Sequence, residues 1–253
     1  MWIVEYRELI RILTVSDLKV KYQSSVLGFL WSLLNPLLMM LVLYAVFKNV
    51  FRFDQDNFAL YLLIGIVSWR FLQNGTSTSM SAIVNKPSLV TKVYVPRQIL
   101  VLASVLSSFT SSILEFTVLV PLLLFFGVEL SLNVLFFPLI HAIFFLIVYG
   151  TSLILAALYV YYRDLNQIWE VLLQAAFFLS PIVYPISIVP EKYLGVYMKN
   201  PATVLIEMYR ETLLYGEAPS IGEIAIVIVA AGAVLLAGTA LFRRLEGRFA
   251  EEI

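Results

Sequence analysis

The sequence contains no cysteine and one histidine, and charged residues make up only 13% of its 253 positions. Without cysteine the chain can form no disulfide, thiolate metal site or catalytic thiol. His141 has no partner at the spacing of a paired-histidine metal site, so we expect a packing role and predict no metal site. The formal net charge is zero, which argues against a nucleic-acid partner.

Catalytic patterns are also absent. The sequence has no GxxxxGK[ST] loop that could cradle the phosphates of a nucleotide. Its carboxylates are scattered, and no nucleophile lies beside a base. We therefore predict that the chain is not an enzyme and binds no cofactor itself.

Hydrophobic residues are abundant, at 61% of the chain. Soluble domains average about 45–50% apolar and about 25% charged residues, so this composition predicts a polytopic membrane protein. The first long apolar run follows a charged segment of roughly 20 residues that has no small-residue cleavage site, so we expect no cleavable signal peptide.

Long apolar runs predict an all-α integral membrane fold with six transmembrane helices, in one transmembrane domain over residues 1–253. Most runs reach the roughly 20 residues that span a bilayer. They cover residues 26–47, 58–79, 98–127, 134–161, 165–184 and 221–241. Apolar and charged positions in residues 1–22 repeat at helical spacing, which predicts an amphipathic helix on the membrane surface or a solvated helix packed on another protein.

The fifth run and the residues after it carry the most unusual pattern. Six side chains fall at alternating spacings of three and four, so they share one polar and aromatic helix face; they are Gln167, Glu170, Gln174, Phe177, Pro181 and Tyr184. Three prolines between 181 and 190 break the helix. A second amphipathic piece, 200–216, begins at Pro201 and is too charged to cross lipid. Broken backbone at membrane depth is tolerated only beside protein or water, so we predict the outer mouth of a pathway.

The first apolar run also has a special face, on which small and polar residues recur from Ser25 to Met39. Such residues pack against other helices or face a pore. Although many aromatics belong to the usual interfacial belt, rings beside amides in a wet channel suit a polyhydroxylated ligand. Six helices leave no room for a polymer path, so we predict a homodimer with the first and fifth runs lining its seam. The expected channel-lining residues are Ser32, Asn35, Met39, Gln174, Phe177, Pro181 and Tyr184.

Lysine and arginine placement predicts orientation. Eleven of these residues fall on the side of the two ends and five on the other side, so the positive-inside rule places both termini in the cytoplasm. Arg70 and Glu115 each lie twelve residues from the outer end of their runs, about 18 Å deep at 1.5 Å per residue. We predict an intramembrane ion pair, which is structural or contributes directly to a wet channel wall.

Six segments match a known family in order, at residues 17–36, 62–71, 85–100, 161–168, 177–185 and 200–216. With these segments the chain closely resembles the ABC-2 type permeases that export polysaccharides and polyol phosphates, including O-antigen and teichoic acid exporters. The resemblance implies a homodimer with two separate ATP-binding-cassette ATPase subunits, which would bind ATP and Mg²⁺.

The resemblance also implies roles for particular segments. Residues 1–22 resemble the interface helix, 86–97 the coupling helix, and 186–216 the re-entrant outer gate helices. The implied ATPase-coupling residues are Lys86, Lys92, Val93, Tyr94, Val95, Arg97, Arg163 and Asp164, and the outer gate residues are Pro201, Glu207 and Arg210.

The substrate implied by the resemblance is a lipid-linked glycan exported across the bacterial inner membrane. O-antigen is the first choice because the aromatic face suits a sugar chain, and teichoic acid or capsular polysaccharide is the alternative. Lys19, Lys21 and Arg97 would meet the lipid pyrophosphate, although membrane anchoring explains them equally well. Two alternative functions fit the sequence less well. A secondary transporter should carry coupling carboxylates at the midplane, where only Glu115 qualifies. A membrane-embedded sugar transferase should show clustered carboxylates or histidines at one interface, and the sequence shows none.

Overall fold

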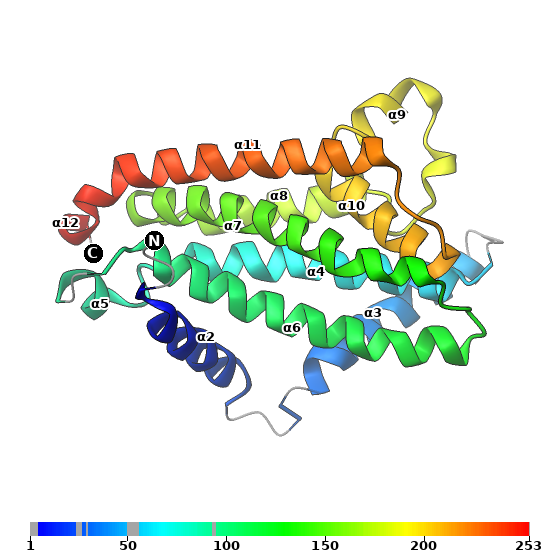
Figure 1. Ribbon diagram of the computed structural model, residues 1–253, viewed down its shortest axis with the longest axis horizontal. Coiled ribbons are helices and arrows are strands. Elements are labelled where there is room, and N and C mark those ends of the chain that lie inside the picture. Colours follow the sequence, from blue (N-terminus) through cyan, green and yellow to red (C-terminus); the bar gives the residue numbers. More distant parts are fainter. Residues whose placement is uncertain (1–4, 24–26, 29, 50–55, 93–94, 253) are drawn as a thin grey trace.

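The computed structural model describes residues 5–23, 27–28, 30–49, 56–92 and 95–252, and these contain helices and no strand. The α-helices are α2 (Arg7–Tyr22), α3 (Leu30–Asn49), α4 (Phe58–Met80), α5 (Pro87–Thr91), α6 (Gln98–Phe125), α7 (Phe137–Tyr161), α8 (Leu165–Leu179), α9 (Glu191–Tyr197), α10 (Pro201–Arg210), α11 (Ile221–Leu245) and α12 (Phe249–Glu252). Short 3-10 helices cover Leu132–Phe136, Ile186–Ile188 and Glu246–Arg248, and a π-helical turn covers Glu211–Tyr215. The long helices α4, α6, α7 and α11 lie along one bundle axis (Figure 1).

Four helical segments among the described residues are long and apolar enough to cross a membrane, namely Leu30–Asn49, Gln98–Phe125, Leu132–Tyr161 and Ile221–Glu252. Helix α4 has 23 residues, but Arg70 and its polar last turns lower its hydropathy. Helix α8 has only 15 residues, about 22 Å at 1.5 Å per residue, against a hydrocarbon core of about 30 Å. The prediction of six spans therefore stays a prediction.

The fifth run is shorter than expected. Helix α8 ends at Leu179, five residues before the predicted boundary at 184. Ser180 is extended (φ −102°, ψ 147°) because the ring of Pro181 disfavours the helical conformation in the residue before it. The chain then continues as turns to α9, which protrudes from the bundle (Figure 1).

Other boundaries also differ from the sequence prediction. The expected coupling helix at 86–97 is helical only over Pro87–Thr91, and Val93 and Tyr94 lie outside the described residues. Helix α3 begins at Leu30. Residues 26 and 29 of the predicted first span, 24–25 just before it and 1–4 of the predicted surface helix lie outside the described part. Helix α6 ends at Phe125, before Gly127 with φ 79°, a conformation that favours glycine.

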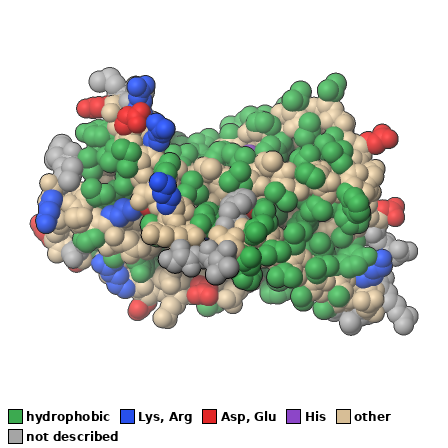
Figure 2. All heavy atoms as spheres, turned by 90° about the horizontal axis from the view of Figure 1, so that it is seen from below, with side chains coloured by type: hydrophobic (Ala, Val, Ile, Leu, Met, Phe, Trp, Pro, Cys, Tyr) green, Lys and Arg blue, Asp and Glu red, His purple; other side chains and the backbone are tan. Residues whose placement is uncertain are grey.

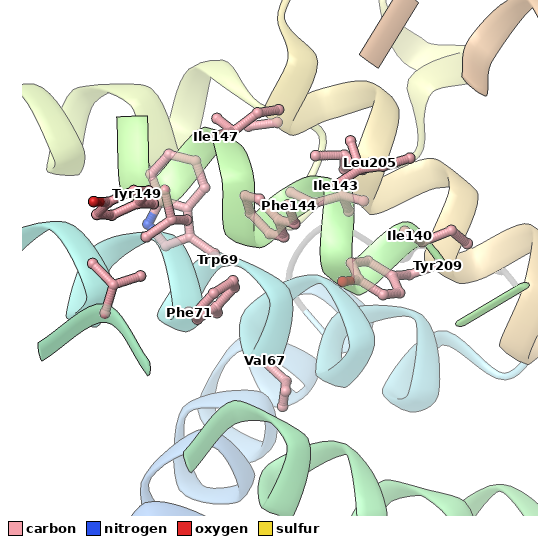
Figure 3. Close-up of a cluster of buried hydrophobic side chains, with 14 of the residues drawn as sticks. Val67, Trp69, Phe71, Ile140, Ile143, Phe144, Ile147, Tyr149, Leu205 and Tyr209 are labelled. Carbon is pink, nitrogen blue, oxygen red and sulfur yellow. The ribbon is translucent and has the colours of Figure 1, made fainter. Parts of the chain in front are cut away.

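Helix α4 lies at the centre of the bundle. It contacts α3, α6, α7, α8 and α10, and most of its residues are buried. Figure 3 shows Trp69 and Phe71 of α4 beside Phe144 of α7 and Tyr209 of α10. His141 of α7 also belongs to this aromatic core, because its Nδ1 lies 2.7 Å from the Tyr209 hydroxyl and its ring stacks on Phe109 at 4.6 Å. The histidine therefore has a packing role.

The polar and apolar parts of the surface are separated along the bundle. Lysine and arginine side chains gather toward the end that carries α2, α5 and α12, whereas hydrophobic side chains cover the broad middle and much of the other half (Figure 2). The start of α2 and the last helix, α12, lie at this same basic end (Figure 1). A wide apolar surface is what a bilayer requires of a spanning protein.

Candidate transport site

A cavity of about 340 Å³ lies between α3, α4 and α8, and we call it the α3–α8 groove. Its lining combines residues predicted on the first and fifth apolar runs with residues of α4. These are Asn35, Met39, Ile66, Trp69, Arg70, Gln73, Leu173, Gln174, Phe177 and Phe178. A largely apolar, ring-lined groove with a few polar side chains is suited to hold a ligand with both hydroxyl groups and apolar faces.

Arg70 provides the charge of the groove. Its Nη1 donates a hydrogen bond of 2.7 Å to Oδ1 of Asn35 on α3, and its Nε lies 3.6 Å from Oε2 of Glu115 on α6. The Glu115 side chain is 3% exposed and that of Arg70 is 19% exposed. The structure thus brings the predicted pair together, with the carboxylate in the protein and the guanidinium at the groove wall, where each offsets the cost of the other's burial.

Aromatic rings also line the groove. The rings of Trp69 and Phe177 meet edge to face with centroids 6.0 Å apart, and Phe178 contacts Phe177 in the same geometry at 5.2 Å. Helix α8 is attached to α4 by Trp169, whose Nε1 donates to Oγ1 of Thr76 at 2.9 Å. Two helices are therefore fixed side by side with rings and amides facing the same space.

The structure places four of the seven predicted lining residues in the groove: Asn35, Met39, Gln174 and Phe177. Ser32 is instead buried, and its Oγ lies 2.6 Å from the Tyr22 hydroxyl. Pro181 is buried as well, because the chain turns inward after α8. Tyr184 is half-buried and donates a 3.0 Å hydrogen bond to the carbonyl oxygen of Phe178, so it braces the turn outside the groove.

Five groove residues were missed by the sequence analysis, namely Ile66, Trp69, Gln73, Leu173 and Phe178. A signal for Gln73 was available, since it follows Arg70 by three residues and helical side chains at that spacing share a face. Trp69 and Phe178 carried no such signal. Rings and aliphatic side chains are frequent along both helices, so the packing of α8 on α4 decides which rings face the groove.

Residues 180–216 contain the predicted outer gate residues, and we call this part of the chain the outer segment. Arg210 is at its centre. The side chain is completely buried and donates at 2.6 Å to the Tyr61 hydroxyl, to the Pro181 carbonyl and to Oε1 of Glu207. Pro201, the third predicted gate residue, begins α10, whose first turn is capped by Asn200 Oδ1 accepting from the Ala202 amide at 3.1 Å. This network holds α10 and the turn after α8 against α4.

Two carboxyls near Arg210, those of Glu207 and Glu211, lie in an environment that disfavours their charged form. Burial raises the pKa of Glu207, and the Arg210 guanidinium opposes this rise. Burial and the carboxylates of Glu223, Glu207 and Glu217 raise the pKa of Glu211 to about 7. The outer segment therefore contains a carboxyl that titrates near neutrality.

The predicted coupling residues that the structure describes lie at the basic end of the bundle. Lys92, Val95 and Arg97 line a cleft of about 710 Å³ together with Arg243 and Glu246 near the chain's last helices. Arg97 donates to the carbonyl oxygen of Glu246. Lys86 is not in this cleft but forms an ion pair with Asp17 of α2, with Nζ 2.8 Å from Oδ1. Arg163 and Asp164 are exposed in the turn before α8.

Comparisons with known proteins identify the family of the chain. Residues 8–214 match the family model of the ABC-2 type transporter. The chain is 31% identical over 252 residues to the O-antigen export system permease protein RfbA of Myxococcus xanthus, covering 98% of this chain and 96% of the relative. A Klebsiella pneumoniae protein of the same name is 29% identical over 245 residues, covering 96% and 94%. The polysialic acid transport protein KpsM of Escherichia coli is 22% identical over 240 residues, covering 92% of each chain.

The helical bundle, its apolar surface and the groove between its helices define a polytopic membrane permease. The family model covers most of the chain, and its relatives are transport components rather than enzymes. The chain belongs to the ABC-2 type transporter family.

Proposed function

We propose that this chain is the membrane subunit of an ATP-driven exporter that moves a lipid-linked polysaccharide from the cytoplasm across the bacterial inner membrane, through a channel between two copies of the chain. The observation that carries the proposal is the α3–α8 groove, in which polar and aromatic side chains from three helices meet at a cavity of about 340 Å³.

The surroundings of the groove support a second copy as its missing wall. Exposed apolar side chains flank the groove, with Leu38 and Leu41 on α3 and Val171 and Leu172 on α8. Helix α8 is too short to cross the bilayer alone and carries exposed Gln167, Glu170 and Gln174. Polar side chains at membrane depth require protein or water beside them. A facing copy would supply both and would close two grooves into one conduit.

The chemistry of the groove suits a sugar chain. Aromatic faces such as those of Trp69 and Phe177 stack on the CH faces of sugars, and the amides of Asn35, Gln73 and Gln174 can donate to and accept from hydroxyl groups. Such contacts are weak enough one by one to let a polymer slide past them. An O-antigen is the first candidate, since the relatives at 29–31% identity are named for its export; a capsular or teichoic acid polymer is the alternative.

Energy for transport would come from two ATPase subunits bound at the basic end, on the cytoplasmic side together with both termini. The segment 86–97 would contact these subunits. It connects α4, which contributes Trp69 and Arg70 to the groove lining, with α6, which carries Glu115. A push on this segment would reach both helices and widen the seam between the copies as a rigid-body shift.

Co-purification tests this proposal. The full-length chain is expressed with the ATP-binding-cassette ATPase of its own genome, and we expect a stoichiometric complex whose ATP hydrolysis responds to added lipid-linked glycan. Replacing Val93, Tyr94 and Val95 with Asp should detach the ATPase without preventing membrane insertion. The control is Val196→Asp, a single valine-to-aspartate change on exposed α9 at the other end of the bundle, which should leave the complex intact. Stoichiometric ATPase on the triple variant would contradict the proposal.

A further inference from the structure

The end of α11 lies beside the segment 86–97 at the basic end of the bundle. Residues of both parts line the cleft of about 710 Å³ described above, and α12 and α5 lie at this same end (Figure 1). Residues 245–249 connect α11 with α12, and we call them the brace. The brace is short, but it is attached to other parts of the chain by hydrogen bonds and by a buried ring.

The backbone of the brace accepts hydrogen bonds from two other elements. The Tyr161 hydroxyl, at the end of α7, donates to the carbonyl oxygen of Leu245 at 3.0 Å. Arg97, the N-cap residue of α6, donates through Nη1 to the carbonyl oxygen of Glu246. The last carbonyl groups of an α-helix have no partner within the helix, and a cation near them interacts favourably with the helix dipole. The end of α11 is therefore closed by side chains from α7 and from the segment 86–97.

Phe249 is the apolar anchor of the brace. Its side chain is fully buried, and its ring meets the rings of Phe242 and Tyr161 edge to face, with centroids 5.3 and 6.1 Å apart. Helix α12, which begins at Phe249, contacts both α5 and α7. The ring therefore fixes α12 beside the segment 86–97.

Helix α5 needs such neighbours to keep its shape. It has five residues, whereas isolated helices shorter than about 12–15 residues are marginal in water. Its buried residue, Val90, belongs to the same hydrophobic core as Phe249. Lys86 Nζ lies 2.8 Å from Oδ1 of Asp17 on α2, and Arg97 binds the brace. The segment 86–97 is thus attached at both of its ends.

We propose that the brace is a positioning element for energy coupling, which holds the segment 86–97 in place and links it to α7 and α11. This inference rests on the proposed function, in which the ATPase pushes on that segment. The polypeptide joins the segment directly to α4 and α6, and the brace adds the other two long helices. Because α7 and α11 approach so closely that a Cβ at Gly150 would lie 2.8 Å from backbone atoms of Leu235, they would move together. A push on the segment would then shift all four helices as one body.

Hydrogen exchange in the chain alone tests the positioning. The full-length chain is placed in phosphatidylcholine nanodiscs, and mass spectrometry follows the peptide that contains the Val90 and Lys92 amides, which donate within α5. Phe249→Ala should speed this exchange by about 10-fold or more, because it opens a cavity under α12. Tyr161→Phe removes one hydroxyl donor and should speed the exchange by about 5-fold. The matched control is Leu123→Ala, which removes a fully buried side chain near the outer end of α6 and should leave the exchange of α5 unchanged.

ATP hydrolysis by the reconstituted complex tests the coupling. Phe249→Ala should still co-purify with the ATPase and keep its basal rate of hydrolysis, because none of the predicted docking side chains is changed. It should lose most of the stimulation by lipid-linked glycan, because the segment no longer carries the push to α7 and α11. Phe249→Leu retains most of the buried apolar volume and should restore the stimulation. Leu123→Ala should be stimulated as wild type.

The inference would be overturned by any of three results. Unchanged exchange of α5 in both brace variants would show that the brace does not hold the segment, and equal acceleration by Leu123→Ala would show a general loss of stability. Normal glycan stimulation of a Phe249→Ala complex with accelerated exchange would show that the brace has no part in coupling. If Phe249→Ala fails to fold, Tyr161→Phe decides through both measurements. A wild-type chain that binds no ATPase refutes the proposed function and the coupling role with it, whereas the exchange pattern still decides whether the brace positions the segment.

Discussion

The guanidinium carbon of Arg210 lies 3.4 Å from the centre of the Tyr61 ring, and Nη1 of the same arginine donates to the Tyr61 hydroxyl at 2.6 Å. Further bonds reach the carbonyl oxygens of Pro181 and Ile182. One buried side chain from α10 thereby joins the turn after α8 to α4. These outer parts must move together with α4, whereas α9, which has no buried residue, is attached only lightly.

Gly65→Ala should destabilise the outer segment. A Cβ at Gly65 would lie 2.6 Å from Nη2 of Arg210 and 3.3 Å from the Ile182 carbonyl oxygen, so the guanidinium must leave its partners. Overpacking of this kind costs about 1–3 kcal/mol. Thermal unfolding of the purified chain should show a lower midpoint, while Gly195→Ala on α9, where a Cβ meets nothing within 4 Å, should not change it. Equal midpoints for the two variants would contradict the described network.

The pair of Arg70 and Glu115 should behave as one unit in a double-mutant cycle. Removing one partner of a buried ion pair costs about 3–5 kcal/mol because the other charge stays unpaired. We therefore expect Arg70→Gln and Glu115→Gln each to lower stability, and the double variant to be more stable than the sum of the two effects predicts. Additive losses of stability would show that the two side chains do not interact. The same conclusion would follow if Glu115→Gln left assembly and transport unchanged while Arg70→Ala abolished both.

Helices α7 and α11 depend on two glycines. A Cβ at Gly150 would lie 2.8 Å from backbone atoms of Leu235, and a Cβ at Gly238 would collide with the carbonyl oxygen of Gly150. Backbones approach this closely only where a side chain is missing. Gly150→Val should therefore abolish expression of a monodisperse protein. Gly232→Val, also on α11 but with nothing within 4 Å of its Cβ, is the control and should behave as wild type in size-exclusion chromatography.

Glu211 should make stability depend on pH. Burial and neighbouring carboxylates raise the pKa of its carboxyl from 4.5 to about 7 in the folded chain. The folded state thus keeps a proton that the unfolded state releases, so stability falls as the pH rises from 4.5 toward 7 and is level above that. Glu211→Gln should flatten this part of the profile and be more stable than wild type at pH 8. A variant with the same decline as wild type would refute the assignment.

Much of the groove could be predicted from sequence, because helical spacing alone assigns faces. Asn35 and Met39 on α3, and Gln174 and Phe177 on α8, lie in the groove as their spacing indicated. The sequence also indicated that Arg70 and Glu115 form a pair, because residues at equal depth on two antiparallel neighbouring helices lie side by side.

The rest depended on tertiary packing that no periodicity encodes. Pro181 continues the polar face in the sequence, yet the helix ends before it and the chain turns inward. Arg210 reads as a surface charge of an amphipathic piece, but Tyr61 and two distant carbonyl oxygens surround it. The pattern of one segment cannot show which backbone groups of another segment are left to accept its hydrogen bonds.

The most direct test of the account is cross-linking between copies in the membrane, which is convenient because the chain contains no cysteine. Gln174→Cys, on the groove, is compared with Val229→Cys, exposed on α11 at the opposite edge of the bundle from α3 (Figure 1). A short bifunctional maleimide should convert the Gln174→Cys chain to a covalent dimer and leave Val229→Cys monomeric. A monomeric Gln174→Cys chain whose thiol reacts only with lipid-soluble reagents would contradict a channel between two copies.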